Sequence, residues 1–295
     1  MKPLHSICLL FAALTLGAQN KDSLMVRKLY DYYLTKSTSY QNLEVLCKQI
    51  GGRLSGSPQA AKAVEWAVKT MKAAGADTVF LQPCMVPRWE RGAKEVCRLN
   101  SLPLKINNQS LACVALGNSV GTGDKGVKAE VVEVHSFEEL ESLGEKAIKG
   151  KLVFYNVFFD QSKIRTGSAY GEAVKYRGRG ASQAARFGAL AVLVRSMTSV
   201  ADNEPHTGNM NYDTTVNKNK IPAVALSYLA ADALHQTLQK DTHAMVYLET
   251  HCRKLPDAPS FNVVGQLNGT EKPNEYIITG GHLDSWDNGD GAHDD

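Results

Sequence analysis

Apolar residues recur at roughly helical spacing through residues 22–50, with an interruption near residues 35–39. A repeat close to 3.6 residues predicts helix. A further helix is predicted over residues 60–74, because Ser57 can cap its first turn and Pro58 suits its first position. An apolar run over residues 79–85 then predicts a strand.

Short apolar runs alternate with helical patterns between about Gly121 and Lys254. The runs predict strands over residues 151–157, 189–194, 221–226 and 244–248. Three helices are predicted in the same region. The first begins after Ser136, where Glu139 completes a capping box, the second covers residues 181–187, and the third runs from Ser227 to about residue 239. A region with its own apolar strands and helices can hold a separate core, so we expect an α+β domain over residues 121–254.

Two more strands are predicted near the end of the chain. Residues 261–267 form one apolar run, and Asn268-Gly269 is a strong hairpin-turn signal. Residues 276–279 form the second run, which stops at two glycines and predicts a buried strand ending at a turn. We therefore expect residues 20–120 and 255–295 to form one α/β domain with a mixed sheet between helical layers, interrupted by the 121–254 insert.

Composition and charge narrow the function. The 295 residues are 43% hydrophobic and 21% charged with a net charge of +3, and no Lys/Arg cluster stands out, which argues against nucleic acid as a partner. Residues 1–19 resemble a secretory signal peptide, with Lys2 ahead of an apolar core and small residues at its end, so we expect a secreted or periplasmic protein. No later apolar run is long enough to span a membrane. Outside residues 1–19 the chain has five cysteines, and none of them are at CxxC spacing. This pattern indicates neither a disulfide framework nor a cysteine metal site.

The candidate chemistry lies just after the predicted strand 276–279. His282 and Asp284 follow the glycines, and Asp294 comes twelve residues after His282. Imidazole and carboxylate suit a zinc-like ion, and Asp284 is placed to accept the second ring N–H of His282. Alternatives remain on these residues alone: His-x-Asp is a common pair, and Asp-Asp often caps a helix. The acidic loop does not have the spacing of an EF-hand calcium site.

The full string G-G-H-L-D-S-W-D-N-G-D-G-A-H-D-D closely resembles the metal motif of the co-catalytic two-zinc exopeptidases, in particular their carboxypeptidase Q-like branch. The resemblance implies that His282 binds one zinc ion, that Asp284 orients the catalytic site, and that Asp294 bridges two zinc ions. The stretches L-S-G-S-P-Q and M-V-P-R-W-E-R-G near the amino terminus add to it. So does A-A-R-F-G-A-L-A-V-L-V with I-P-A-V-A-L, which resembles a protease-associated domain inserted into the peptidase fold.

The resemblance implies a metallo-exopeptidase that hydrolyses dipeptides or short peptides with a metal-activated water, and it leaves open carboxypeptidase, aminopeptidase or dipeptidase specificity. It also allows a homodimer. The family places its general base and remaining ligands further along, so we expect this chain to carry only the first part of the site and to be inactive by itself. The alternative is a non-catalytic binding or adhesion protein on the same fold.

Other polar residues are better explained as structural. We interpret Arg53, Trp89 and Arg91 as loop-stabilising residues, and His206 as part of a solvated loop over residues 195–220. The absence of G-x-S-x-G and Walker motifs gives no support to a serine hydrolase or a nucleoside triphosphatase.

Overall fold

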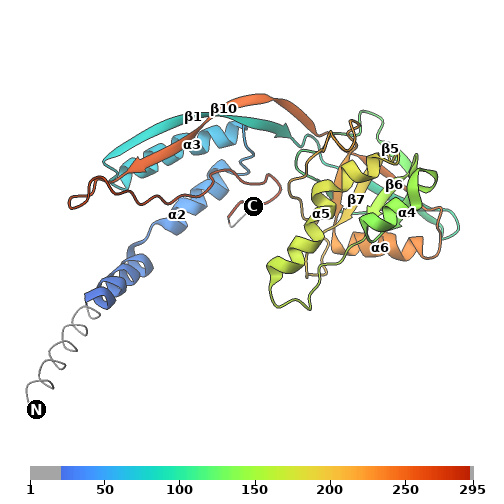
Figure 1. The fold of residues 1–295 in the computed structure, drawn as a ribbon, viewed down its shortest axis with the longest axis horizontal. Coiled ribbons are helices and arrows are strands. Elements are labelled where there is room, and N and C mark those ends of the chain that lie inside the picture. Colours follow the sequence, from blue (N-terminus) through green and yellow to red (C-terminus); the bar gives the residue numbers. More distant parts are fainter. Residues whose placement is uncertain (1–20, 293–295) are drawn as a thin grey trace, which may run out of the picture. The chain divides into compact units, whose positions relative to one another are not determined.

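The computed structural model describes residues 21–292, which fall into two compact units (Figure 1). Unit 1 contains the chain up to Gln82 together with everything from Asn262 onward. Unit 2 is the continuous stretch Pro83–Phe261. It therefore extends beyond the 121–254 insert expected from the sequence at both of its ends.

The helices of unit 1 follow the predicted pattern. A helix runs through residues 21–36, stops, and is followed by α2 (Ser39–Glu44) and the π-helix η1 (Val45–Ile50), so the predicted interruption near residues 35–39 is confirmed. The next helix is α3 (Pro58–Ala73), and the Ser57 side chain accepts a hydrogen bond from the Ala60 amide at 3.1 Å. Burial in this unit is sparse: its described buried apolar residues are Cys47, Ala63, Val64 and Ala67.

Two long strands carry the chain between the units. β1 (Thr78–Glu90) pairs with β10 (Arg253–Gln266) in a two-stranded sheet, and the boundary between the units falls inside both strands. Asn262 donates to the Gln82 side chain at 3.0 Å where the boundary crosses the pair. The chain thus leaves unit 1 after Gln82 and re-enters it at Asn262.

Unit 2 is built on one mixed sheet of eight strands, in the order β3-β2-β9-β5-β6-β7-β8-β4. Its strands are β2 (Val96–Ser101), β3 (Ile106–Ser110), β4 (Cys113–Ala115), β5 (Val127–Val134), β6 (Leu152–Tyr155), β7 (Ala191–Arg195), β8 (Ala223–Leu226) and β9 (Met245–Glu249). The strands β5 to β8 are mutually parallel, and the outer strands pair antiparallel with them or with each other. The mixed α/β class predicted from the sequence is confirmed for the chain as a whole. The mixed sheet, however, lies in unit 2, whereas it was predicted for residues 20–120 and 255–295.

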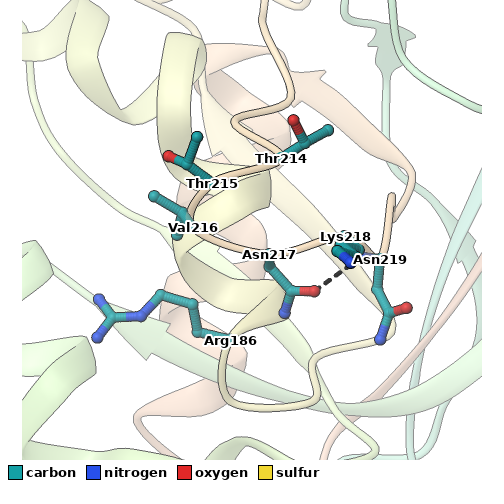
Figure 2. A pocket seen from close by; sticks show the side chains of 7 residues that line it. All are labelled: Arg186, Thr214, Thr215, Val216, Asn217, Lys218 and Asn219. Atoms are coloured by element: carbon teal, nitrogen blue, oxygen red, sulfur yellow. Dashed lines mark hydrogen bonds between the residues drawn. The ribbon is translucent and has the colours of Figure 1, made fainter.

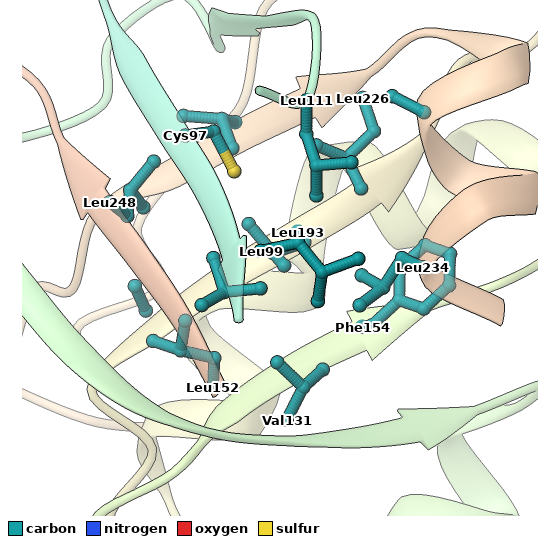
Figure 3. Packing of buried hydrophobic residues seen from close by; sticks show 14 of the residues in the cluster. Cys97, Leu99, Leu111, Val131, Leu152, Phe154, Leu193, Leu226, Leu234 and Leu248 are labelled. Carbon is teal, nitrogen blue, oxygen red and sulfur yellow. The ribbon is translucent and has the colours of Figure 1, made fainter. Parts of the chain in front are cut away.

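Both faces of this sheet are covered, which explains the continuous apolar runs of its central strands. Leu152 and Phe154 of β6 point into one core cluster with α6 (Tyr228–Leu238), shown in Figure 3. Val153 and Tyr155 point into the opposite cluster, which also contains residues of α4 (Phe137–Ile148) and α5 (Thr166–Ala185). Alternate residues of one strand therefore belong to opposite cores, as the two-residue repeat of a strand requires.

Several expectations need correction. Residues 276–279 are not a buried strand: Ile277 and Ile278 are almost fully exposed, because no strand of the described chain lies beside them to complete a hydrogen-bond ladder. The hairpin predicted at Asn268-Gly269 is absent for the same reason, since β10 ends at Gln266 and the described residues after it contain no strand returning along it. The helix predicted over residues 181–187 begins much earlier, at Thr166.

Candidate metal centre

The segment that carries the predicted motif is a loop without helix or strand through residues 267–292. It is nevertheless anchored. The Ser285 amide donates to the Arg53 carbonyl at 3.1 Å, and the Ser285 hydroxyl accepts from the Arg53 amide at 3.2 Å. Ser285 is buried in this way, although the residues around it are largely exposed. The motif is therefore fixed to the turn that follows η1.

The predicted contact between His282 and Asp284 is present. The His282 Nδ1 atom lies 2.9 Å from the Asp284 carbonyl oxygen and 3.1 Å from its carboxylate Oδ1. Nδ1 carries the proton in that arrangement, so the lone pair of the neutral ring is on Nε2. An imidazole whose Nδ1–H is directed to a carboxylate is the usual form of a zinc-binding histidine. The donor set therefore fits zinc at Nε2 of His282.

Asp294, the predicted bridging ligand, lies outside the described residues. Within residues 21–292, no three His, Cys, Asp or Glu side chains come together as a complete metal site would require. The described part of the chain thus presents one oriented histidine and its carboxylate partner.

The end of the motif is also tied to η1. The Lys48 ammonium lies 2.6 Å from the Asp290 carboxylate, and this hydrogen bond, with the charge of Asp290, raises the pKa of Lys48 above its ordinary value. The Cys47 thiol donates to the Gly291 carbonyl at 3.5 Å. Both side chains of the ion pair are well exposed, so the pair contributes little to stability.

The residues interpreted as structural are engaged in packing. The Trp89 indole donates to the Ser119 carbonyl at 2.8 Å, and the Arg91 guanidinium donates to the Ala115 carbonyl at 2.6 Å. Arg91 also lies over the Trp89 ring. His206 is exposed, and its amide donates to the Ser196 hydroxyl at 2.8 Å. Arg53 stabilises a loop, as interpreted, but the loop that it anchors is the distant motif loop. The sequence does not predict this, because it contains no signal for which distant carbonyls an arginine reaches.

Unit 2 contains a surface cavity whose lining lacks the groups of a catalytic site. Figure 2 shows the Arg186 side chain and residues 214–219 around a cavity of about 610 Å³. Two cations and several polar groups line it, with no acid, histidine or cysteine. Groups able to transfer protons at neutral pH or to bind zinc are therefore absent from its lining.

Cys97 and Cys252 belong to a core cluster of unit 2, and Cys113 packs against that cluster. No disulfide joins Cys47, Cys84, Cys97, Cys113 or Cys252. A hydrogen bond with Cys113, followed by burial, raises the pKa of the Cys97 thiol well above its usual value. A thiol that stays protonated is a poor metal ligand and nucleophile.

Comparison with known proteins agrees with the motif. Residues 262–295 match the family model described as peptidase family M28. A solved structure, a peptidase M28 precursor from Shewanella amazonensis, superimposes with a TM-score of 0.84 at 32% identity and covers 92% of this chain and 60% of its own. These findings confirm the relationship to the M28 peptidases that the motif predicts.

Sequence relatives of this chain are carboxypeptidase Q proteins. The chain is 37% identical to carboxypeptidase Q of Xenopus laevis over 260 residues and 36% identical to that of Homo sapiens over 264 residues. The matches cover 88% and 90% of this chain but 52% of each relative, so the chain spans about half the length of these proteins. The predicted resemblance to the carboxypeptidase Q-like branch is thereby confirmed. Over the described residues, we find no helix with the length and apolarity needed to cross a membrane.

Proposed function

We propose that this chain is the amino-terminal part of a zinc-dependent exopeptidase that hydrolyses dipeptides or short peptides. The observation that carries the proposal is the orientation of His282, whose Nδ1 faces Asp284 within a motif that matches peptidase family M28. His282 would bind zinc through Nε2, and Asp284 would hold the ring in that tautomer. Asp294 would offer two carboxylate oxygens to a pair of zinc ions.

Bound zinc would supply a Lewis acid that polarises the scissile carbonyl and lowers the pKa of water. His282 and Asp294 cannot complete such a centre by themselves, because one imidazole and one bridging carboxylate fall short of about three protein ligands per catalytic zinc. We assign the general base and remaining ligands to the part of such an enzyme that this chain does not span, since its match covers 52% of the Xenopus laevis relative. The signal-like residues 1–19 support a secreted or periplasmic enzyme, and the protease-associated character of unit 2 is part of the same proposal.

The test compares the full-length protein with the 295-residue chain, both without residues 1–19. We expect dipeptide hydrolysis by the full-length protein that a chelator abolishes and zinc restores, and no hydrolysis by the shorter chain. His282→Ala and Asp294→Ala should each lower kcat/KM by at least about a thousandfold, because a catalytic zinc stabilises the transition state by several kcal/mol. His206→Ala is the matched control and should keep most of the activity. Chelator-sensitive turnover by the shorter chain would contradict the ligand count, and a zinc-loaded but inert full-length protein would favour the binding or adhesion alternative.

Peptides blocked at one end identify the recognised terminus. The relatives' name, carboxypeptidase, supports a requirement for a free carboxyl terminus. We therefore expect amidation of the substrate carboxylate to abolish cleavage, while acylation of its amino terminus is tolerated. The reverse pattern would assign an aminopeptidase, and sensitivity to both blocks would assign a dipeptidase.

A further inference from the structure

Arg53 is buried in a part of the chain where little else is. It is 4% exposed, whereas Gly51, Gly52 and Leu54 around it are only partly covered. Its guanidinium donates to four main-chain carbonyls: those of Leu46 and Gly51 at 3.0 Å, Leu283 at 3.0 Å and Gly291 at 3.1 Å. A planar fork with five donors is the side chain best suited to join several acceptors in one fixed geometry.

Two of these carbonyls lie inside the metal motif, between its two predicted ligands in the sequence. Leu283 directly follows His282, and Gly291 precedes Asp294 by three residues. Two residues that are eight positions apart in the sequence can be separated by roughly 27 Å in extended chain. Both ends of the segment from Leu283 to Gly291 nevertheless lie within hydrogen-bond distance of a single guanidinium, so Arg53 closes the segment between the two predicted ligands into a loop.

A second observation, independent of the guanidinium, shows how closely this loop is seated. A methyl group on Gly52 would lie 2.7 Å from the Asp287 Cα atom and 3.3 Å from the Trp286 carbonyl oxygen. Contacts below 3.0 Å to backbone atoms cannot be relieved by a rotamer change. Gly52 therefore permits a backbone approach that any larger residue would push apart.

We propose that Arg53 is a positioning residue for the metal centre: by holding the Leu283 and Gly291 carbonyls, it fixes the backbone of the loop that begins beside His282. This inference rests on the proposed function. Closing the loop before metal arrives removes an entropic cost that zinc binding would otherwise bear. Arg53 acts through the backbone of the loop and does not itself contact substrate or metal in this role.

The test measures zinc affinity of the full-length protein by competition with a chromophoric chelator, alongside the Tm of the metal-free form. Arg53→Lys keeps the charge but offers one nitrogen in place of the fork. We expect its zinc dissociation constant to rise about 10-fold to 100-fold, the range typical when a group supporting a metal ligand is lost. Activity should return toward the wild-type value at saturating zinc.

Matched variants separate positioning from general destabilisation. Gly52→Ala leaves Arg53 in place but displaces the loop, and should weaken zinc binding as Arg53→Lys does. Gly289→Ala, where an added methyl group meets nothing, should leave the affinity within twofold of wild type. Arg195→Lys alters the other buried arginine, in unit 2, and should lower Tm without changing zinc affinity.

The outcomes are distinguishable. If Arg53→Lys and Gly52→Ala lower Tm but leave zinc affinity within twofold of wild type, Arg53 is only structural and the inference is overturned. If Arg53→Lys does not fold, the comparison of Gly52→Ala with Gly289→Ala decides the question through the displaced loop alone. If the wild-type protein binds no zinc, the proposed function itself fails, whatever the variants do.

Discussion

At the scale of single residues, the described chain buries two arginines, and arginine is rarely buried without a partner. Arg53 satisfies its donors with main-chain carbonyls, whereas Arg195 combines the main-chain carbonyl of Tyr228, at 3.4 Å, with two side chains. The Arg195 guanidinium lies 2.6 Å from the Asp232 carboxylate and 2.5 Å from the Asn156 side-chain oxygen. It also lies 4.1 Å from the centre of the Phe158 ring. Arg195 thus links the carboxyl end of β7 to α6 and to the residue that follows β6.

Replacing Arg195 by Met should destabilise unit 2. The substitution leaves Asn156 buried without its cation and Asp232 without its counter-ion. Breaking a buried pair costs about 3–5 kcal/mol, and because the Asp232 side chain is one third exposed we expect a loss of about 2–3 kcal/mol. Urea unfolding measures the change. Asp232→Asn keeps an acceptor for the guanidinium and should cost less, so an equal or larger loss for Asp232→Asn would contradict this account.

At the scale of elements, three helices begin in the same way. The side chains of Ser57, Ser136 and Ser227 each accept a hydrogen bond from the amide three residues later, which satisfies a donor that the first helical turn leaves unpaired. At α4 the Glu139 carboxylate also accepts from the His135 amide at 2.6 Å. Each helix therefore starts where its serine predicts it to start.

Removing one cap should have a measurable and local effect. Ser136→Ala should lower the free energy of unfolding by about 1 kcal/mol, because the Glu139 amide loses its acceptor. Ser142 lies in the same helix on its exposed side and donates to the Glu139 carbonyl, so Ser142→Ala is the control and should change little. Equal losses for both variants would show that the serine side chains matter for a reason other than capping.

At the scale of the whole molecule, apolar burial is distributed unequally between the units. The two core clusters lie entirely within Pro83–Phe261. In unit 1, by contrast, Leu34 is 80% exposed and Ile277 and Ile278 are exposed almost completely. Segments with few buried apolar contacts open at low free-energy cost.

Limited proteolysis should reveal this difference. We expect thermolysin to cut the 295-residue chain first within residues 21–36 and 268–283 and to leave a resistant fragment close to Pro83–Phe261. Mass spectrometry of the fragments over time identifies the order of cleavage. Initial cuts within residues 127–249 would show that the eight-stranded sheet is not the stable part of the chain.

Local signals in the sequence were sufficient to predict several helices and strands of this protein and the family of its motif. Ser57, Ser136 and Ser227 predicted their helices because a cap and its helical turn are neighbours in the chain. The runs at β6 to β9 predicted strands because a sheet covered on both faces requires uninterrupted apolar residues there. The motif around His282 predicted the peptidase family and the contact between His282 and Asp284, since two residues of spacing leave little freedom in how these side chains meet.

Only the tertiary structure decided which segments share a sheet and what holds the motif. The strands β2, β3 and β5 carry charged and polar residues among their apolar ones, and no local pattern shows that they belong to the sheet of β9 rather than to unit 1. The apolar run 276–279 does not form the predicted strand. A strand needs a partner strand, and whether one is available depends on parts of the chain that are distant in the sequence. The acceptors of Arg53 also depend on distant chain, so the sequence does not predict them. They are four carbonyls up to 238 residues away, and main-chain carbonyls are identical at every position of a sequence.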